Sequence, residues 1–230
     1  MVSKKKSKLC TSIAADSLEE MEQKTELALY FGTDLVEFRI DRLMSRVTPA
    51  EIVQKLGKHA PVAVVTVRSG KEGGSFTGSE IERLGLITSL AQMKPAYIDV
   101  ELSTAVENQR WLGSLPKKVE RIVSWHDFKG TPDMATLRAK ASDALKQGTI
   151  AKVVTTATAL EDSLRTLKLC GENPGKVISF CMGQLGTSSR ILSMLEQSPI
   201  VYASLPNEPV APGQISIATL IEFRGLMPAA

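Results

Sequence analysis

The sequence has few of the residues from which metal sites and disulfide frameworks are built. Its 230 residues include only three cysteines and two histidines. Cys10, Cys170 and Cys181 are widely spaced and form no Cys-x-x-Cys pair, which argues against a zinc site or a disulfide framework and indicates a reducing cytosol. We therefore expect a cytoplasmic protein that uses no metal and no cofactor.

Long apolar runs and a strong net charge are also missing. No run reaches the roughly 18 apolar residues of a membrane span, and the N-terminus lacks the apolar stretch of a secretory signal. The net charge of +3 comes largely from four lysines within residues 1–8, which are predicted to form a flexible basic tail. Because no second basic cluster accompanies the tail, we expect binding neither to nucleic acid nor to membranes.

What the sequence does contain is a regular alternation of short apolar, β-branched runs with longer segments of helical spacing. The apolar runs predict strands at 8–14, 35–41, 61–68, 96–102, 121–128, 150–157, 176–183 and 200–205. Helices are predicted between them, for example at 18–30, 80–92, 134–146 and 160–170. Ser79, followed three residues later by Glu82, is typical of a capping box at the start of one of these helices.

This alternation predicts a single-domain (β/α)₈ TIM barrel spanning residues 1–230. Eight strands alternate with eight helices without a break in composition, and barrels of this class have about 250 residues. An open doubly wound sheet is the alternative, because a count of strands does not prove closure. No Gly-x-Gly-x-x-Gly or P-loop motif follows the first strand, and charged residues recur within several strands; both observations favour the barrel.

Charged and polar residues recur at every second position inside five of the predicted strands, so they share one face of each strand. In a barrel that face is the interior, and barrel enzymes place their sites at its C-terminal end. The structural alternative is that these residues form buried ion pairs that only stabilise the barrel. Burying each ion costs free energy, so charged residues gathered from five strands indicate a functional site. The residues are Glu37, Arg39, Asp41, Thr66, Arg68, Asp99, Glu101, Ser124, His126 and Lys152.

Lys152 is the most informative of these residues. Its neighbours in the strand are alanine and valine, and burial among apolar groups favours a neutral amine, which is a nucleophile toward ketones and aldehydes. Two structural roles stay open: a lysine that extends to the barrel mouth, or one paired with Asp99 or Glu101. His126, at the end of its strand, suits proton transfer, whereas His59 is expected at the surface of the opposite end.

Three further candidates lie in loops that follow strands. Glu72 is in a glycine-rich loop just after Arg68, Arg190 follows the seventh strand in a segment suited to begin a helix, and Gln214 follows the eighth. Arginine suits bidentate binding of a carboxylate. A phosphate site at the last two loops is the alternative, but no Gly-Gly pair occurs there.

Taken together, these motifs resemble the type I 3-dehydroquinate dehydratase family. The resemblance implies a hydro-lyase on a TIM barrel, often a homodimer, that acts without a cofactor. Its reaction would be the dehydration of 3-dehydroquinate to 3-dehydroshikimate in the shikimate pathway of aromatic amino-acid biosynthesis. The matching segments run in order along nearly the whole chain: VEFRID (36–41), TVRSGKEGGSFTG (66–78), IDVEL (98–102), SWHDFKGTP (124–132), AKVV (151–154), MGQLGTSSR (182–190) and APGQIS (211–216).

The resemblance also implies a role for each candidate residue. Lys152 would form a Schiff base with the substrate ketone, His126 would act as general acid and base, and Glu72 would orient His126. Arg190 and Gln214 would hold the substrate carboxylate. The remaining substrate-binding residues would be Ser12, Glu37, Arg39 and Arg68.

The sequence departs from the family pattern at Val210, where many members carry a serine, and at Phe180, where a methionine is common. The resemblance implies that the loop after the eighth strand closes over the site as a lid. Valine at position 210 cannot make the side-chain hydrogen bond that a serine would make in this loop. Two other functions stay open. A class I aldolase also uses a barrel lysine but normally needs a phosphate site, and a non-catalytic barrel would leave the lysine protonated. The apolar segment 217–226 either packs on the core or contributes to a dimer contact.

Overall fold

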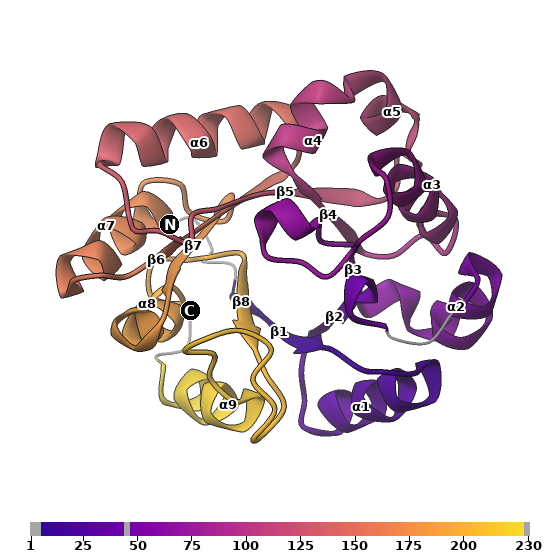
Figure 1. The fold of residues 1–230 in the computed structure, drawn as a ribbon. Coiled ribbons are helices and arrows are strands. Elements are labelled where there is room, and N and C mark those ends of the chain that lie inside the picture. The colour runs from indigo at the N-terminus through magenta and orange to yellow at the C-terminus, as the bar shows by residue number, and fades with distance from the viewer. Residues whose placement is uncertain (1–5, 44–46, 228–230) are drawn as a thin grey trace.

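The computed structural model describes residues 6–43 and 47–227, and in this part of the chain eight parallel strands form a nearly closed barrel with helices outside it (Figure 1). Each strand begins within two residues of its predicted start. The strands are β1 (Lys8–Ile13), β2 (Leu35–Arg39), β3 (Ala63–Thr66), β4 (Tyr97–Glu101), β5 (Glu120–His126), β6 (Ile150–Thr156), β7 (Val177–Met182) and β8 (Ile200–Ala203).

The helices follow the predicted alternation with one exception. Between β4 and β5 the chain forms two short helices, because Asn108 leaves helical geometry at φ −123° and ψ 43°. The α-helices are α1 (Leu18–Tyr30), α2 (Pro49–Leu56), α3 (Glu80–Ala91), α4 (Leu102–Glu107), α5 (Gln109–Ser114), α6 (Met134–Gln147), α7 (Leu160–Gly171), α8 (Thr187–Leu192) and α9 (Ile217–Leu226). Short 3₁₀ helices are η1 (Ile40–Arg42), η2 (Gly57–Val62), η3 (Gly70–Glu72) and η4 (Gln184–Gly186). None of the described helices is long and apolar enough to cross a membrane.

The strand order confirms the predicted barrel. Hydrogen-bonded neighbours run β7-β6-β5-β4-β3-β2-β1-β8, and every pairing is parallel. In the described residues no pairing joins β7 to β8, which is why the barrel is nearly rather than fully closed. The register places Glu37 beside Ser12 and Lys152 beside Ser124. The parallel arrangement therefore brings the C-terminal ends of all the strands to one end of the barrel.

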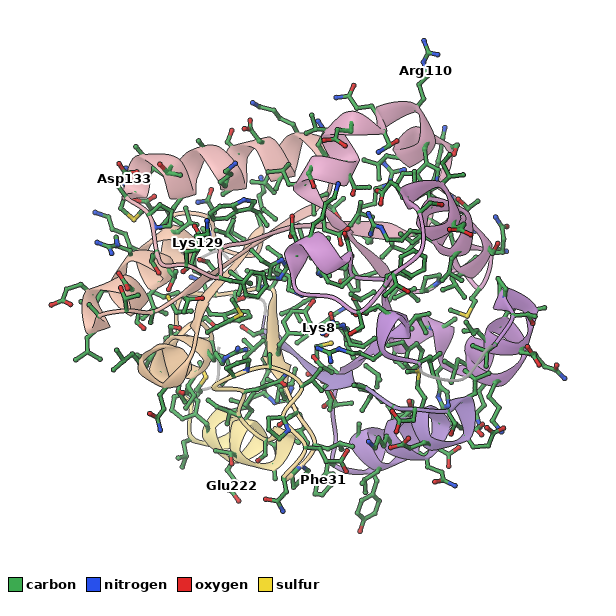
Figure 2. All side chains as sticks on the ribbon, viewed as in Figure 1. Lys8, Phe31, Arg110, Lys129, Asp133 and Glu222 are labelled. Carbon is green, nitrogen blue, oxygen red and sulfur yellow. The ribbon has the colours of Figure 1, made fainter. Side chains whose placement is uncertain are left out.

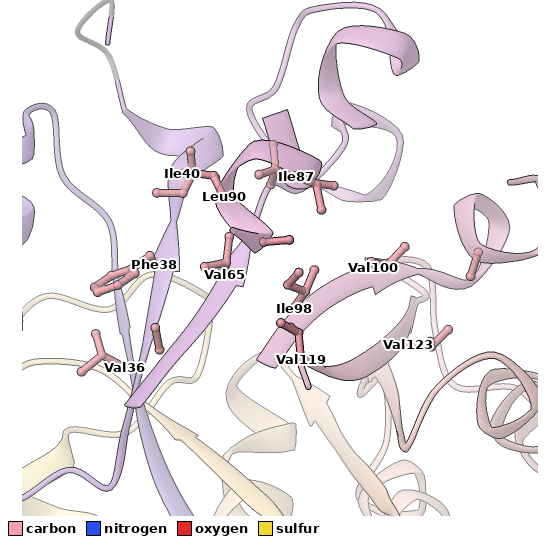
Figure 3. Packing of buried hydrophobic residues seen from close by; sticks show 14 of the residues in the cluster. Val36, Phe38, Ile40, Val65, Ile87, Leu90, Ile98, Val100, Val119 and Val123 are labelled. Carbon is pink, nitrogen blue, oxygen red and sulfur yellow. The ribbon is translucent and has the colours of Figure 1, made fainter. Parts of the chain in front are cut away.

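The apolar residues form two layers. One lies between the strands and the surrounding helices. It includes Phe38 of β2, Val65 of β3 and Ile98 of β4, with Ile87 and Leu90 of α3 on the helix side of Val65 (Figure 3). The other lies in the barrel interior and includes Cys10, Leu35, Val64, Ile122, Ile150, Ile178 and Tyr202. Side chains occupy the space within the ring of strands, with Lys8 near its middle in this view (Figure 2).

Two predictions about the N-terminal end of the barrel need correction. Residues 1–5 of the predicted tail lie outside the described residues, but Lys8 already belongs to β1 and its backbone N–H donates to the carbonyl of Pro199. His59 is buried, with 9% of its surface exposed. The 3₁₀ turn η2 places its ring beside Glu22 and Glu26 of α1, a tertiary contact that no local pattern predicts.

Candidate active site

A pocket opens at the C-terminal ends of the strands, and its walls contain all nine residues to which the resemblance gave a role. Every strand except β4 contributes, together with the loop around η3, helix α8 and the loop before α9. Interior positions converge here because alternate side chains of each strand point inward. The predicted residues that line the pocket are Ser12, Glu37, Arg39, Arg68, Glu72, His126, Lys152, Arg190 and Gln214.

Lys152 lies at the base of the pocket and is 5% exposed. Its Nζ is 3.0 Å from Oδ2 of Asp99 and 3.6 Å from Oε1 of Glu37. The pairing with Asp99 that the sequence left open is present in the structure. The two carboxylates come from β2 and β4 across the barrel, whereas Ala151 and Val153, the immediate neighbours of Lys152, belong to the layer outside the strands.

Asp99 connects the charged groups of the interior. Its carboxylate accepts hydrogen bonds from Nη2 of Arg68 at 2.8 Å and from the hydroxyl of Ser124 at 2.6 Å, in addition to the contact with Lys152. Burial alone would raise the pKa of Asp99, but Arg68 and Lys152 hold it well below its usual range. Asp99 therefore stays ionised, and it anchors the amine without competing for its proton.

His126 and Glu72 form a second pair at the rim. Nδ1 of the imidazole is 2.9 Å from Oε2 of Glu72, and the ring of Phe128 stacks alongside at 6.1 Å between centroids. Burial, reinforced by the positive charge of Arg68, lowers the pKa of His126 well below its usual value. Burial also raises the pKa of Glu72 to about 7. When Glu72 is ionised, it accepts the Nδ1 hydrogen and leaves Nε2 of a neutral imidazole free to act as a base.

The loop after β3 places Glu72 opposite the imidazole. Near the start of this loop, the backbone N–H of Ser69 donates to Oε1 of Glu101 at 2.8 Å. Gly73 ends η3 with φ 72°, and a Cβ atom there would lie 2.5 Å from the ring of Phe128. A side chain at this position would therefore be strained and would push Phe128 away from His126.

Glu37 and Arg39, which follow one another on the interior face of β2, are each held by neighbours. Glu37 accepts hydrogen bonds from the hydroxyls of Ser12 at 2.6 Å and Thr66 at 2.9 Å. Arg39 forms a bidentate pair with Asp41, at 3.0 and 2.8 Å. These contacts fix the orientation of both side chains toward the pocket before any ligand binds.

Arg190 is a buried cation without a counter-ion among the described residues. It is 2% exposed, its guanidinium lies 4.3 Å from the centroid of the Phe180 ring, and Nη2 donates to the carbonyl of Pro212 at 3.2 Å. No carboxylate of the described residues lies within ion-pairing distance, and Nε has no hydrogen-bond partner among them. Burial lowers the pKa of Arg190 to about 10, yet it stays charged at neutral pH. This arrangement is suited to an anionic ligand.

Gln214 makes its hydrogen bonds within the protein. Its Oε1 accepts from the backbone N–H groups of Val210 at 2.8 Å and Ala211 at 3.3 Å, and Nε2 donates to the carbonyl of Ala203 at 2.8 Å and the hydroxyl of Ser12 at 3.3 Å. The side chain of Val210 cannot make the hydrogen bond that a serine could make, but its backbone N–H binds Gln214. Both amide hydrogens already have acceptors, so Gln214 braces this loop in the structure.

Two residues that contact the Lys152 amine carried no predicted role in binding or catalysis. Asp99 was predicted to face the barrel interior, from its alternation with Glu101 in the fourth strand, and was considered as an ion-pair partner of Lys152. Tyr202 lies in an otherwise apolar strand and offers no such signal. In the structure, Nζ of Lys152 is 4.0 Å from the centroid of its ring.

The fold and the pocket together define a (β/α)₈-barrel enzyme whose site is built around a buried lysine. A family model described as type I 3-dehydroquinase matches residues 9–228, and the chain belongs to this family. The resemblance predicted from the sequence is therefore confirmed.

Similar proteins cover almost the whole chain. The 3-dehydroquinate dehydratase of Methanocaldococcus jannaschii is 34% identical over 221 residues, which are 95% of this chain and 98% of the relative. That of Methanothermobacter thermautotrophicus is 35% identical over 225 residues, 96% of this chain and 98% of the relative. The crystal structure of the Geobacillus kaustophilus 3-dehydroquinate dehydratase matches with a TM-score of 0.81 and 25% identity, covering 96% of this chain and 90% of that one.

Proposed function

We propose that this enzyme dehydrates 3-dehydroquinate to 3-dehydroshikimate in the shikimate pathway, through a Schiff base on Lys152. The family membership and the names of the relatives support the reaction. The observation that carries the choice of substrate is Arg190, a buried cation without a carboxylate partner in the described residues, in the same pocket as Lys152. A substrate with a carboxylate and a ketone satisfies both groups at once.

The first chemical requirement is that Lys152 lose a proton before it attacks the ketone. Asp99 does not take that proton, because Arg68 and Lys152 hold its pKa well below the usual range despite its burial. His126 is a neutral base in the pocket. Glu72, whose pKa burial raises to about 7, is placed to accept a proton from Nδ1 of His126 at neutral pH.

The Lys152 nitrogen then attacks the C3 carbonyl carbon to give a carbinolamine, which loses its oxygen as water and becomes a protonated imine. The imine draws electrons from the C2–H bond, so His126 removes the C2 proton through Nε2. His126 next returns a proton to the C1 hydroxyl, which leaves as water. Hydrolysis of the imine consumes one water and releases the product, so the overall reaction loses one water.

Substrate binding follows from the charges around the pocket. We propose that Arg190 binds the carboxylate with two N–H donors and that Ser12, Glu37, Arg39 and Arg68 contact the ring hydroxyls. The contacts of Gln214 with the loop suggest that it supports the carboxylate site from behind. It would reach the carboxylate itself only if the loop rearranged on binding.

The test is to incubate the protein with 3-dehydroquinate and borohydride and to locate the reduced adduct by peptide mass spectrometry. The adduct is expected on Lys152. It should be absent from Lys152→Ala and retained in Lys168→Ala, which removes an exposed lysine of α7. An adduct elsewhere, or none, contradicts the Schiff-base mechanism. A class I aldolase or a non-catalytic barrel would give no adduct with this substrate.

His126 is tested separately with His126→Ala. Turnover should fall strongly, while some adduct on Lys152 still forms, because the amine and its carboxylate partners are unchanged. Unchanged turnover would remove His126 from the proposed role.

We also propose that the enzyme is a cytoplasmic homodimer. Three buried free cysteines agree with a reducing compartment. Leu160 and Leu164 of α7 and Leu185 of η4 are exposed apolar side chains on the side of the barrel that also carries α8 (Figure 1). By contrast, α9 buries Ile217 and Leu220 in the core. Light scattering measures the molar mass of the unchanged protein and of Leu164→Lys in solution. We expect the mass of a dimer for the unchanged protein and that of a monomer for the variant.

A further inference from the structure

Tyr202 lies directly against the reacting nitrogen. It belongs to β8, is 3% exposed, and its ring centroid is 4.0 Å from Nζ of Lys152. Its hydroxyl has no hydrogen-bond partner among the described residues. The contact that the structure gives this side chain with the site is thus made by the face of the ring and not by the hydroxyl.

The proposed reaction changes what the nitrogen can bind. An ammonium group has three N–H donors, and in the resting protein Asp99 at 3.0 Å and Glu37 at 3.6 Å both face it. A protonated imine keeps the positive charge but has a single N–H, so it can donate to only one of the two carboxylates. An aromatic face attracts a cation without needing an N–H directed at it. Its interaction therefore persists when the ammonium becomes an iminium.

We propose that the ring of Tyr202 is a catalytic group that stabilises the iminium on Lys152 through its π face. This inference rests on the Schiff-base chemistry proposed above. The ring also separates the nitrogen from the apolar layer of the barrel interior, to which Tyr202 belongs together with Cys10 and Ile178. Removing the ring would expose a cationic intermediate to an apolar cavity.

The simplest variants separate the ring from the hydroxyl. Tyr202→Phe keeps the ring and should retain kcat within about twofold. Tyr202→Leu removes the ring and should lower kcat and the fraction of Lys152 trapped by borohydride by about 30-fold, the size of a desolvated cation–π contact. KM should change little, because the ring of Tyr202 faces Lys152, whereas Arg190, which is proposed to bind the carboxylate, lies over Phe180. Tyr97→Leu is the matched control, since it removes a ring beside Lys8 at the opposite end of the barrel.

A graded series excludes a purely structural role. Tyr202 is replaced by phenylalanine carrying zero, one, two or three ring fluorines, which weaken the negative face of the ring with little change of shape. The logarithm of kcat should fall steadily with the number of fluorines, while the thermal midpoint stays nearly constant. This series remains informative if Tyr202→Leu fails to fold.

The outcomes distinguish this inference from the proposed function. If the unchanged protein gives no adduct on Lys152, the Schiff-base mechanism fails. If it gives the adduct but kcat does not respond to fluorination, the role of Tyr202 is overturned and the mechanism stands. A Tyr202→Phe variant as impaired as Tyr202→Leu would assign the effect to the hydroxyl and would also overturn the inference.

Discussion

Nη1 of Arg83 lies 2.7 Å from Oε2 of Glu101, and both side chains are almost fully buried. The other oxygen of this carboxylate accepts the N–H of Ser69 at 2.8 Å, at the start of the loop that carries Glu72. The pair therefore connects α3, the end of β4 and the loop that carries Glu72.

Arg83→Met is expected to lower the free energy of unfolding by about 3–5 kcal/mol, because it leaves the Glu101 carboxylate buried without its main partner. Urea unfolding measures the change. Arg138→Met is the control, since it breaks an exposed pair with Glu172 and should cost at most about 1 kcal/mol. Equal losses in the two variants would contradict the structural importance of the Arg83 pair.

The pH dependence of kcat/KM should report the ionisation of Glu72. The pKa of Glu72 is raised by burial to about 7, so the carboxyl loses its proton as the pH rises through that value. Ionised Glu72 then holds the Nδ1 hydrogen of His126 and leaves Nε2 as the base. Activity should rise roughly tenfold between about pH 6 and pH 8, as a single ionisation near 7 requires.

Glu72→Gln should abolish this rise and lower activity throughout the range. Glu82→Gln, which removes an exposed carboxylate at the start of α3, should keep it. Persistence of the step in Glu72→Gln would assign it to another group.

Arg190→Met should separate binding from stability. Losing the carboxylate-binding cation should raise KM by about 100-fold, the size of a pair of charge-assisted hydrogen bonds. Because Arg190 has no counter-ion in the described residues, its removal should leave the free energy of unfolding unchanged or increase it. Steady-state kinetics and thermal unfolding provide the two readouts.

Arg39→Met is the comparison variant. It leaves the buried Asp41 without its bidentate partner and should therefore lower the free energy of unfolding. A destabilised Arg190→Met with an unchanged KM would contradict the assignment of Arg190 to the carboxylate.

Gln214→Ala should loosen the loop before α9. The substitution leaves the N–H groups of Val210 and Ala211 without their shared acceptor, at a cost of about 1–2 kcal/mol of local stability. Hydrogen exchange across residues 206–213 should quicken and KM should rise several-fold. Gln184→Ala, at an exposed position in η4, should change neither. Unchanged exchange in Gln214→Ala would show that the loop is held by other contacts.

Much of the fold could be predicted because strand and helix periodicities are local properties. The short β-branched runs around Val36 and Val153 have the length and composition of buried strands, and both form strands. The capping box of Ser79 and Glu82 predicted the residue at which α3 begins. The prediction was wrong where a tertiary contact decides burial, as at His59, and where a single residue, Asn108, divides one predicted helix into two.

The same division applies to the site. The period-two placement of charges in β2, β3, β5 and β6, with the motifs in the loops, was enough to place eight side chains in one pocket, and the family resemblance added Ser12. It did not reveal that the apolar neighbours of Lys152 face away from it, or that Tyr202 lies against its nitrogen.

The sequence by itself determined which residues face the barrel interior at its C-terminal end, and through its motifs the family to which the chain belongs. The tertiary structure alone decided the partner of each charge: Asp99 for Lys152, Glu72 for His126, and no carboxylate of the described residues for Arg190. The physical reason is that periodicity assigns a side chain to a face, whereas ion pairing depends on distances of a few ångströms between strands far apart in the chain. Burial, which also depends on the tertiary structure, raises the pKa of Glu72 and lowers that of His126, and these shifts set the direction in which protons can move.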